Sequence, residues 1–166
     1  MSDDTVEIGT WVPGILLRIA LVAAIGGGAW LLQPGIGWQV IAIVLALIGA
    51  VLPQTGAAWF AMLVVPIAVI VQDPDIGRAC LAVLVVHLGH VLAALSLTIP
   101  ARSRIALAAL RPTAVRWLAV QATAQAIAVL AVALPTADGR GNAWLAPMGA
   151  VAVVAIAAIL LRRIRR

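Results

Sequence analysis

The sequence predicts an all-α fold, a polytopic transmembrane helix bundle, and three observations lead to this prediction. Of the 166 residues, 64% are hydrophobic and only 10% are charged, whereas an average soluble domain has about 25% charged residues. The mean hydropathy is +1.16, which implies more apolar surface than one soluble core of this size can bury. The apolar residues also form long continuous runs, unlike the alternating pattern of a barrel strand. In lipid the backbone must satisfy its own hydrogen bonds, so helices are the expected spanning elements.

The N-terminal half contains three apolar runs of unequal length. The first, residues 11–32, is long enough for a hydrocarbon core that needs about 20 residues, and it ends at the turn signal of residues 33–35. Residues 38–52 and 57–71 follow, joined by a turn at residues 53–56, and both runs are short for a crossing. We expect either two short crossings or one re-entrant hairpin buried in protein.

The C-terminal half contains three further apolar runs. Residues 78–98 form a full-length span that ends before Pro100, and residues 116–134 form the fifth span. Residues 144–161 form the sixth span, which stops at the final arginines. The fold prediction is therefore six spans, or four full spans plus a short re-entrant hairpin.

Tryptophan positions support these boundaries. Indole rings favour the headgroup region, where the ring is half buried and its N–H reaches water. Every tryptophan of the chain lies within a few residues of a proposed helix end, namely Trp11, Trp30, Trp38, Trp59, Trp117 and Trp144.

Arginine placement predicts the orientation of the chain. The net charge is +5, and most arginines lie in the connection of residues 99–116 or in the tail after residue 161. The positive-inside rule places both segments in the cytoplasm, so we predict a multi-pass plasma-membrane protein with both termini cytoplasmic. These arginines are expected to bind the anionic headgroups of the bilayer, and no nucleic-acid partner is expected because the chain has no soluble basic face. The predicted headgroup-binding residues are Arg102, Arg104, Arg111, Arg116, Arg162, Arg163, Arg165 and Arg166.

One helical domain is predicted to account for nearly the whole chain. Residues 11–161 are expected to form a single transmembrane domain between a short acidic cytoplasmic N-terminus, residues 1–10, and a basic cytoplasmic tail, residues 162–166. Within this domain, residues 101–110 fit either a short helix lying on the headgroups or an ordinary loop.

Five polar residues within the predicted spans form the candidate site, because polar and ionisable groups in a membrane are unfavourable unless they have a role. His87 and His90 lie three positions apart, and Gln121 and Gln125 lie four apart, so each pair shares a helix face. Counted from the predicted cytoplasmic ends, Arg18, His90 and Gln125 lie at one depth, roughly 10–12 Å into the membrane. The prediction is one intramembrane polar cluster.

Several roles remain open for this cluster. Arg18 either belongs to it or snorkels to the headgroups. The histidines and glutamines either hold helices together or line a path for a proton or solute. Metal or haem ligation is weaker, because two histidines on one helix need ligands from elsewhere. No metal and no cofactor are therefore predicted.

Function is predicted from the lack of a chemical motif and from the amount of apolar surface. The spans contain no paired carboxylates, and the chain has no recognisable nucleophile motif or phosphate loop, so it is not expected to be an enzyme. Small loops and many alanines favour a non-catalytic subunit or accessory protein of a membrane complex, bound to a protein partner or to further copies of itself. The alternative is a small oligomeric transporter or channel that uses the Arg/His/Gln cluster. A weaker third possibility is an electron-transfer anchor that binds haem or quinone through the histidines.

Overall fold

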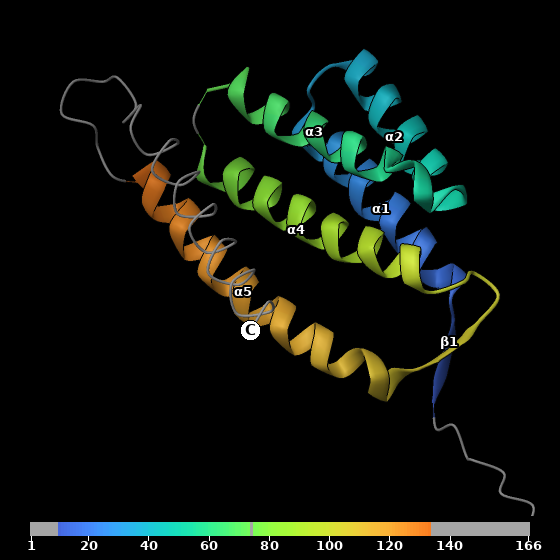
Figure 1. Ribbon diagram of the computed structural model, residues 1–166. Helices are drawn as coiled ribbons and strands as arrows, with labels where there is room; N and C mark the ends of the chain where they lie inside the picture. Colours follow the sequence, from blue (N-terminus) through green and yellow to red (C-terminus); the bar gives the residue numbers. More distant parts are fainter. Residues whose placement is uncertain (1–9, 74, 134–166) are drawn as a thin grey trace, which may run out of the picture. The chain divides into compact units, whose positions relative to one another are not determined.

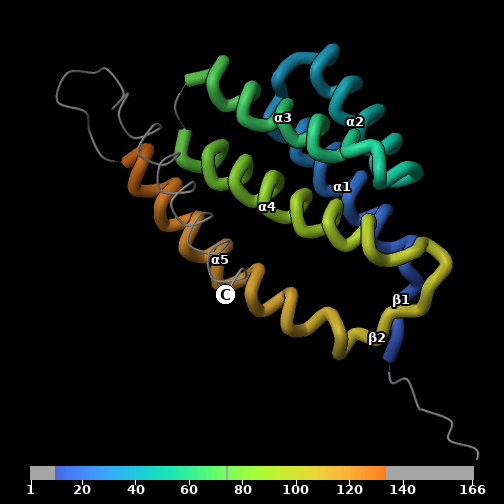
Figure 2. The backbone as a smooth tube through the Cα atoms, in the orientation of Figure 1, coloured from blue at the N-terminus to red at the C-terminus, as the bar shows by residue number. Residues whose placement is uncertain are grey.

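The computed structural model describes residues 10–73 and 75–133, which all belong to one compact unit ending at Ala133. Within these residues the chain is almost entirely helical, as Figures 1 and 2 show. The α-helices are α1 (Ile15–Leu32), α2 (Ile36–Val51), α3 (Ala57–Ile70), α4 (Ile76–Thr98) and α5 (Leu107–Ala133), with a short 3₁₀ helix, η1 (Pro53–Thr55), between α2 and α3. Two short strands, β1 (Trp11–Pro13) and β2 (Arg104–Ala106), complete the described elements.

Three of these helices, α1, α4 and α5, are long and apolar enough to cross a membrane, and α2 and α3 are shorter apolar helices. The all-helical prediction is therefore confirmed in its coarse form. The count of six spans is not supported, because the described residues contain five α-helices. The sixth predicted span, residues 144–161, lies outside the described residues, and the single domain over residues 11–161 stays a prediction.

Local sequence explains where two of the helices meet the turns beside them. α1 ends at Leu32, and the residue that caps it, Gln33, has a left-handed backbone at φ 48°. Gly35 follows with a φ of 104°. A left-handed residue after the last turn is a common helix ending. Asp75 caps the start of α4, and its side chain accepts a hydrogen bond of 2.7 Å from the Arg78 backbone N–H. This carboxylate satisfies one of the free N–H groups at the helix start.

Helices α1 to α4 pack closely around a shared core. α1 contacts α2 and α4, α3 contacts α2 and α4, and the most deeply buried large side chains are Leu21, Ile25, Leu32 and Val65. Small residues allow the close approaches. A Cβ atom added to Gly49 of α2 would lie 2.5 Å from the backbone nitrogen of Ala58 in α3. Glycine at such a contact lets two helix backbones approach each other.

α2 runs antiparallel along nearly the whole of α1. Near its start, the Gln39 side chain lies 3.5 Å from the Ala29 carbonyl of α1, and at its end the Ala50 carbonyl lies 2.6 Å from the Arg18 side chain. The 16 residues of α2 correspond to a length of about 24 Å. The α2–α3 pair therefore extends along the bundle from one end of α1 to the other.

The structure corrects the start of the first helix. Trp11 was expected within it, but α1 begins at Ile15, and Trp11–Pro13 forms β1, which pairs antiparallel with β2. Gly14 makes this junction possible, because a Cβ at this position would overlap the Pro100 carbonyl oxygen, and the Gly14 N–H donates to the Ser103 carbonyl at 2.8 Å. The junction ties the start of α1 to the connection that follows α4.

Residues 101–110 form neither a surface helix nor an irregular loop. They contain a turn, then β2, and from Leu107 the first part of α5. Strand pairing with β1 and burial of Ile105, which is 8% exposed, hold residues 104–106 extended. The fifth helix thus begins well before residue 116, with Pro112 inside it, and Trp117 lies within the helix instead of at its end.

Candidate functional site

Arg18 lies in the first turn of α1 and caps the end of α2. Its Nη1 donates to the Ala50 carbonyl at 2.6 Å and to the Val51 carbonyl at 3.4 Å. The last carbonyls of a helix have no partner within the helix and carry partial negative charge, so a guanidinium is well matched to them. Because α1 begins at Ile15, Arg18 lies only about 5 Å from the start of this helix, measured along its axis. The predicted depth was roughly 10–12 Å.

His87 of α4 and Gln121 of α5 form the polar contact between these two helices. His87 Nδ1 and Gln121 Oε1 are 2.8 Å apart, with the histidine nitrogen as donor in the tautomer that this contact requires. Gln121 is only 6% exposed, and the Trp117 ring lies tilted beside His87 with 6.0 Å between ring centroids. A hydrogen bond between helices is a common packing device in membrane proteins, and this pair fits the packing interpretation of the histidines and glutamines.

His90 faces a different neighbour. Its ring stacks on Trp59 of α3, with centroids 5.1 Å apart and an interplanar angle of 18°. Three residues of helix turn a side chain by about 60° from alignment, and α4 lies between α3 and α5 (Figure 1). The two histidines therefore contact different helices.

Gln125 lies further from the start of α5 than predicted. Its Nε2 donates to the Cys80 carbonyl at 3.0 Å, near the beginning of α4 and away from His90. The predicted depth was too small because the helix was expected to begin at residue 116, whereas α5 begins at Leu107. The structure thus brings together His87 and Gln121, but it does not gather all five predicted side chains into one cluster.

Some buried polar atoms of these residues have no hydrogen-bond partner among the described residues. They are Gln121 Nε2, Gln125 Oε1 and Trp117 Nε1, on the side of α5 that faces α4, and Arg18 Nε on α1. Buried groups of this kind are few in folded proteins. On α5, a free donor and a free acceptor lie one helical turn apart, at Gln121 and Gln125.

Two further glutamines join helices and were missed in the sequence. Gln72 Nε2 donates to the carbonyls of Leu32 and Ala68, both at 2.8 Å, and so ties the end of α1 to the end of α3. Gln39 is 9% exposed and lies against the Ala29 carbonyl. The available signal was a glutamine next to a helix end, where free carbonyls lie within reach of an amide.

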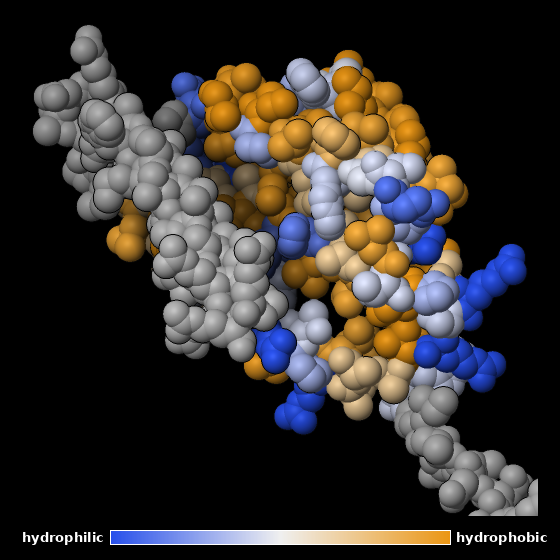
Figure 3. Space-filling view, in the orientation of Figure 1, coloured by the Kyte–Doolittle hydropathy of each residue, from blue (hydrophilic) through white to orange (hydrophobic). Residues whose placement is uncertain are grey.

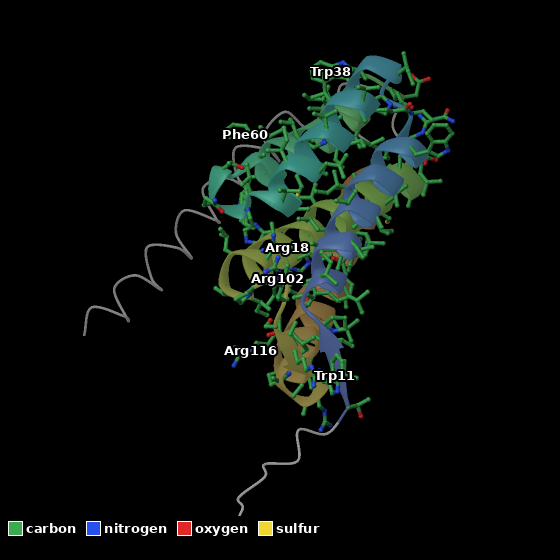
Figure 4. All side chains as sticks on the ribbon, turned by 90° about the vertical axis from the view of Figure 1, so that its right-hand side faces the viewer. Trp11, Arg18, Trp38, Phe60, Arg102 and Arg116 are labelled. Atoms are coloured by element: carbon green, nitrogen blue, oxygen red, sulfur yellow. The ribbon has the colours of Figure 1, made fainter. Side chains whose placement is uncertain are left out.

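The predicted headgroup-binding arginines of the described chain are all exposed. Arg104 lies over the Trp11 ring, 4.5 Å from its centroid, in a cation–π contact. On the face seen in Figure 3, strongly hydrophilic side chains lie at the right-hand and lower margins, toward β1 and β2, with smaller groups near the centre and at the upper left, and apolar residues cover much of the rest. Figure 4 shows Arg18, Arg102, Arg116 and Trp11 toward this end, with Trp38 toward the opposite end. The arginines of residues 162–166 lie outside the described residues.

Metal ligands do not cluster in the part of the chain that the structure describes. Residues 10–73 and 75–133 contain no group of three or more histidine, cysteine or acidic residues placed to hold an ion.

Comparison with known proteins adds no relative, since no family model, curated protein or solved structure matches the chain.

Proposed function

We propose that this chain is a multi-pass protein of the plasma membrane and serves as a non-catalytic subunit or accessory protein of a membrane complex. The observation that carries the proposal is that the other described residues cover α5 poorly. Of its 27 residues only Gln121 and Ala128 are buried, and its main contacts with other described elements are with α4 and β2. Such a long apolar helix offers a surface to lipid or to another membrane helix.

Small residues on the side of α5 that the other described residues leave exposed favour a protein partner over lipid alone. Ala119, Ala122, Thr123 and Ala126 are exposed, and their spacing of three and four places them together on one side. Small residues at this spacing let helix backbones pack closely, which is how helices associate in lipid. The partner is another membrane protein or a second copy of the chain.

The use of polar side chains supports the same proposal. Arg18 caps α2, His87 meets Gln121, and Gln125 reaches a carbonyl of α4. These groups therefore bind helices to one another and do not converge on one path. A bundle held together in this way suits a scaffold that presents α5 to a partner.

We further propose that α2 and α3 are short crossings, because α2 extends along α1 from the level of Ala29 to that of Arg18. The positive-inside rule then places the β1–β2 end, with Arg102 and Arg104, in the cytoplasm. Asp73 and Asp75 lie on the other side. Both termini are assigned to the cytoplasm on charge.

Affinity purification in mild detergent with quantitative mass spectrometry tests the subunit proposal. One membrane protein, or a second copy, should co-purify at fixed stoichiometry. Ala122→Phe should reduce its yield at least about tenfold, because a ring on the small-residue side keeps a helix from close approach. Ala94→Phe adds the same ring to an exposed position of α4 and should leave the yield unchanged.

Two results would contradict the subunit proposal. One is a monomer that purifies without any partner, with both phenylalanine variants behaving alike. The other comes from a photo-crosslinking residue at position 122: crosslinks confined to residues 134–166 of the same chain would mean that the chain itself occupies this side of α5.

The unpartnered amide atoms of Gln121 and Gln125 favour a second candidate, a small oligomeric transporter or channel. A polar solute or water between α4 and α5 would satisfy both atoms. Flux into liposomes, measured across a range of pH for His87→Ala and His90→Ala, tests this candidate. A loss of flux confined to His87→Ala supports it, and flux unchanged in both variants removes its basis.

A further inference from the structure

A groove runs between α1 and α2 and has an apolar wall with one cation. Its volume is about 530 Å³, and its lining includes Ile15, Ile19, Val22, Leu47, Val51 and Arg18. Arg18 is the only charged or polar side chain in this lining. Sites for small molecules commonly measure about 300–1,000 Å³ and combine an apolar wall with a few polar anchors.

The guanidinium at this groove is held in place by α2. Arg18 Nη1 donates to the carbonyls of Ala50 and Val51, which orients the planar group beside the last turn of the helix. Nε is buried and has no partner among the described residues, and the second terminal nitrogen, Nη2, donates to neither carbonyl. An arginine fixed in this way keeps donors for an anion, because guanidinium geometry matches phosphate oxygens.

Charge at this end of the bundle is of one sign within the described residues. Arg18 and Arg102 lie toward the β1–β2 end (Figure 4), and Arg104 is part of β2 itself. The only carboxylates among residues 10–73 and 75–133 are Asp73 and Asp75, just before the start of α4 at the opposite end. A ligand that places negative charge at Arg18 therefore meets cations and no described acid.

We infer that the groove binds one anionic phospholipid, with an acyl chain along the apolar wall and the phosphate at Arg18. The apolar lining excludes a fully water-soluble anion as the matching ligand, because such a molecule would leave the wall exposed to water. The single anchoring cation favours a net negative headgroup over a zwitterionic one. This inference rests on the proposed membrane location, but it is independent of the proposed partner on α5.

Native mass spectrometry of the full chain, extracted from vesicles of equal parts phosphatidylglycerol and phosphatidylcholine, tests the site. The wild-type protein should retain one phosphatidylglycerol. Ala23 also lines the groove, so Ala23→Phe should reduce the retained fraction at least about tenfold while Arg18 is kept. Arg18→Lys should retain more lipid than Arg18→Gln, since lysine keeps the charge without the fork of donors.

Ala94→Phe is the matched control and should retain lipid like the wild type. Diacylglycerol, which has the chains without the charge, and glycerol phosphate, which has the charge without the chains, should each compete poorly. Retention that is equal for both phospholipids, unchanged in Ala23→Phe, or displaced by glycerol phosphate alone would overturn the site. Ala122→Phe should lose the protein partner and keep the lipid, so failure of one proposal is distinguishable from failure of the other.

Discussion

Replacing Gly49 by alanine places a methyl group where α2 and α3 approach most closely. The added Cβ would lie 2.5 Å from the backbone nitrogen of Ala58, 2.7 Å from its Cβ and 2.9 Å from its Cα. Non-bonded carbon atoms favour separations of about 3.5–4.0 Å. Two of the three neighbours are backbone atoms, so no side-chain rotation relieves the overlap. The two helices must separate by about 1 Å, and we expect a loss of stability.

The magnitude follows from two opposing terms. Overpacking of this kind destabilises a fold by about 1–3 kcal/mol, whereas alanine is a better helix former than glycine by about 1 kcal/mol. Gly27→Ala is the matched control, because Gly27 also lies within a helix and its added Cβ meets no atom within 4 Å. Both variants gain the helix-forming term, so their difference measures the overlap alone, about 1–3 kcal/mol.

Thermal unfolding in detergent, followed by circular dichroism, is the assay. For a chain of this length 1 kcal/mol shifts Tm by about 2–4 °C, so Gly49→Ala should melt roughly 2–12 °C below Gly27→Ala. Equal melting temperatures would refute the close packing of α2 against α3 and the role of glycine in it.

Two further predictions concern contacts between elements. His87→Ala and Gln121→Ala should show a coupling free energy of about 0.6 kcal/mol, and at most about 1.7 kcal/mol, in a double-mutant cycle of thermal stability; additive effects would mean that the 2.8 Å contact is not formed. Trp11→Ala and Arg104→Ala should be coupled by about 0.5–1 kcal/mol, the value of an exposed cation–π contact, in the same assay. Independent effects there would argue against the stacking seen between β1 and β2.

Local sequence was sufficient to predict several helix ends. The break at residues 33–35 after α1 and the end of α4 before Pro100 are decided by residues within one turn of the boundary. Apolar runs likewise indicated the helical class, because in lipid the hydrogen bonds of a helix are satisfied within the same segment. These features need no information about distant parts of the chain.

The start of α5 could not be predicted in this way. The Leu107 backbone N–H donates to the Thr10 carbonyl at 3.0 Å, and Ile105, in the strand that pairs with β1, is buried in the core of the helix bundle. Both effects join residues far apart in the sequence. Arginines and Pro112 in this region resemble a loop when they are read locally.

The candidate site could be predicted only in part, because several of its contacts also join residues far apart in the sequence. The pairing of His87 with Gln121 follows from two consecutive antiparallel helices, so their residue types were informative. The depth of Gln125 depended on the start of α5, and the separation of His90 from His87 depended on α4 having neighbours on two sides. The target of Arg18 depended on how far α2 extends along α1, which places the Ala50 carbonyl beside the guanidinium.

The proposed crossing of the membrane is tested most directly by the accessibility of single cysteines in intact cells. In a Cys80→Ala background, cysteines are introduced one at a time at Gln33, Asp73 and Ser103 and treated with a membrane-impermeant thiol reagent. The proposed topology predicts that positions 33 and 73 react in intact cells, whereas position 103, beside the exposed arginines of the β1–β2 end, reacts only after the cells are permeabilised. Equal labelling of all three positions in intact cells, or of none until permeabilisation, would contradict this topology.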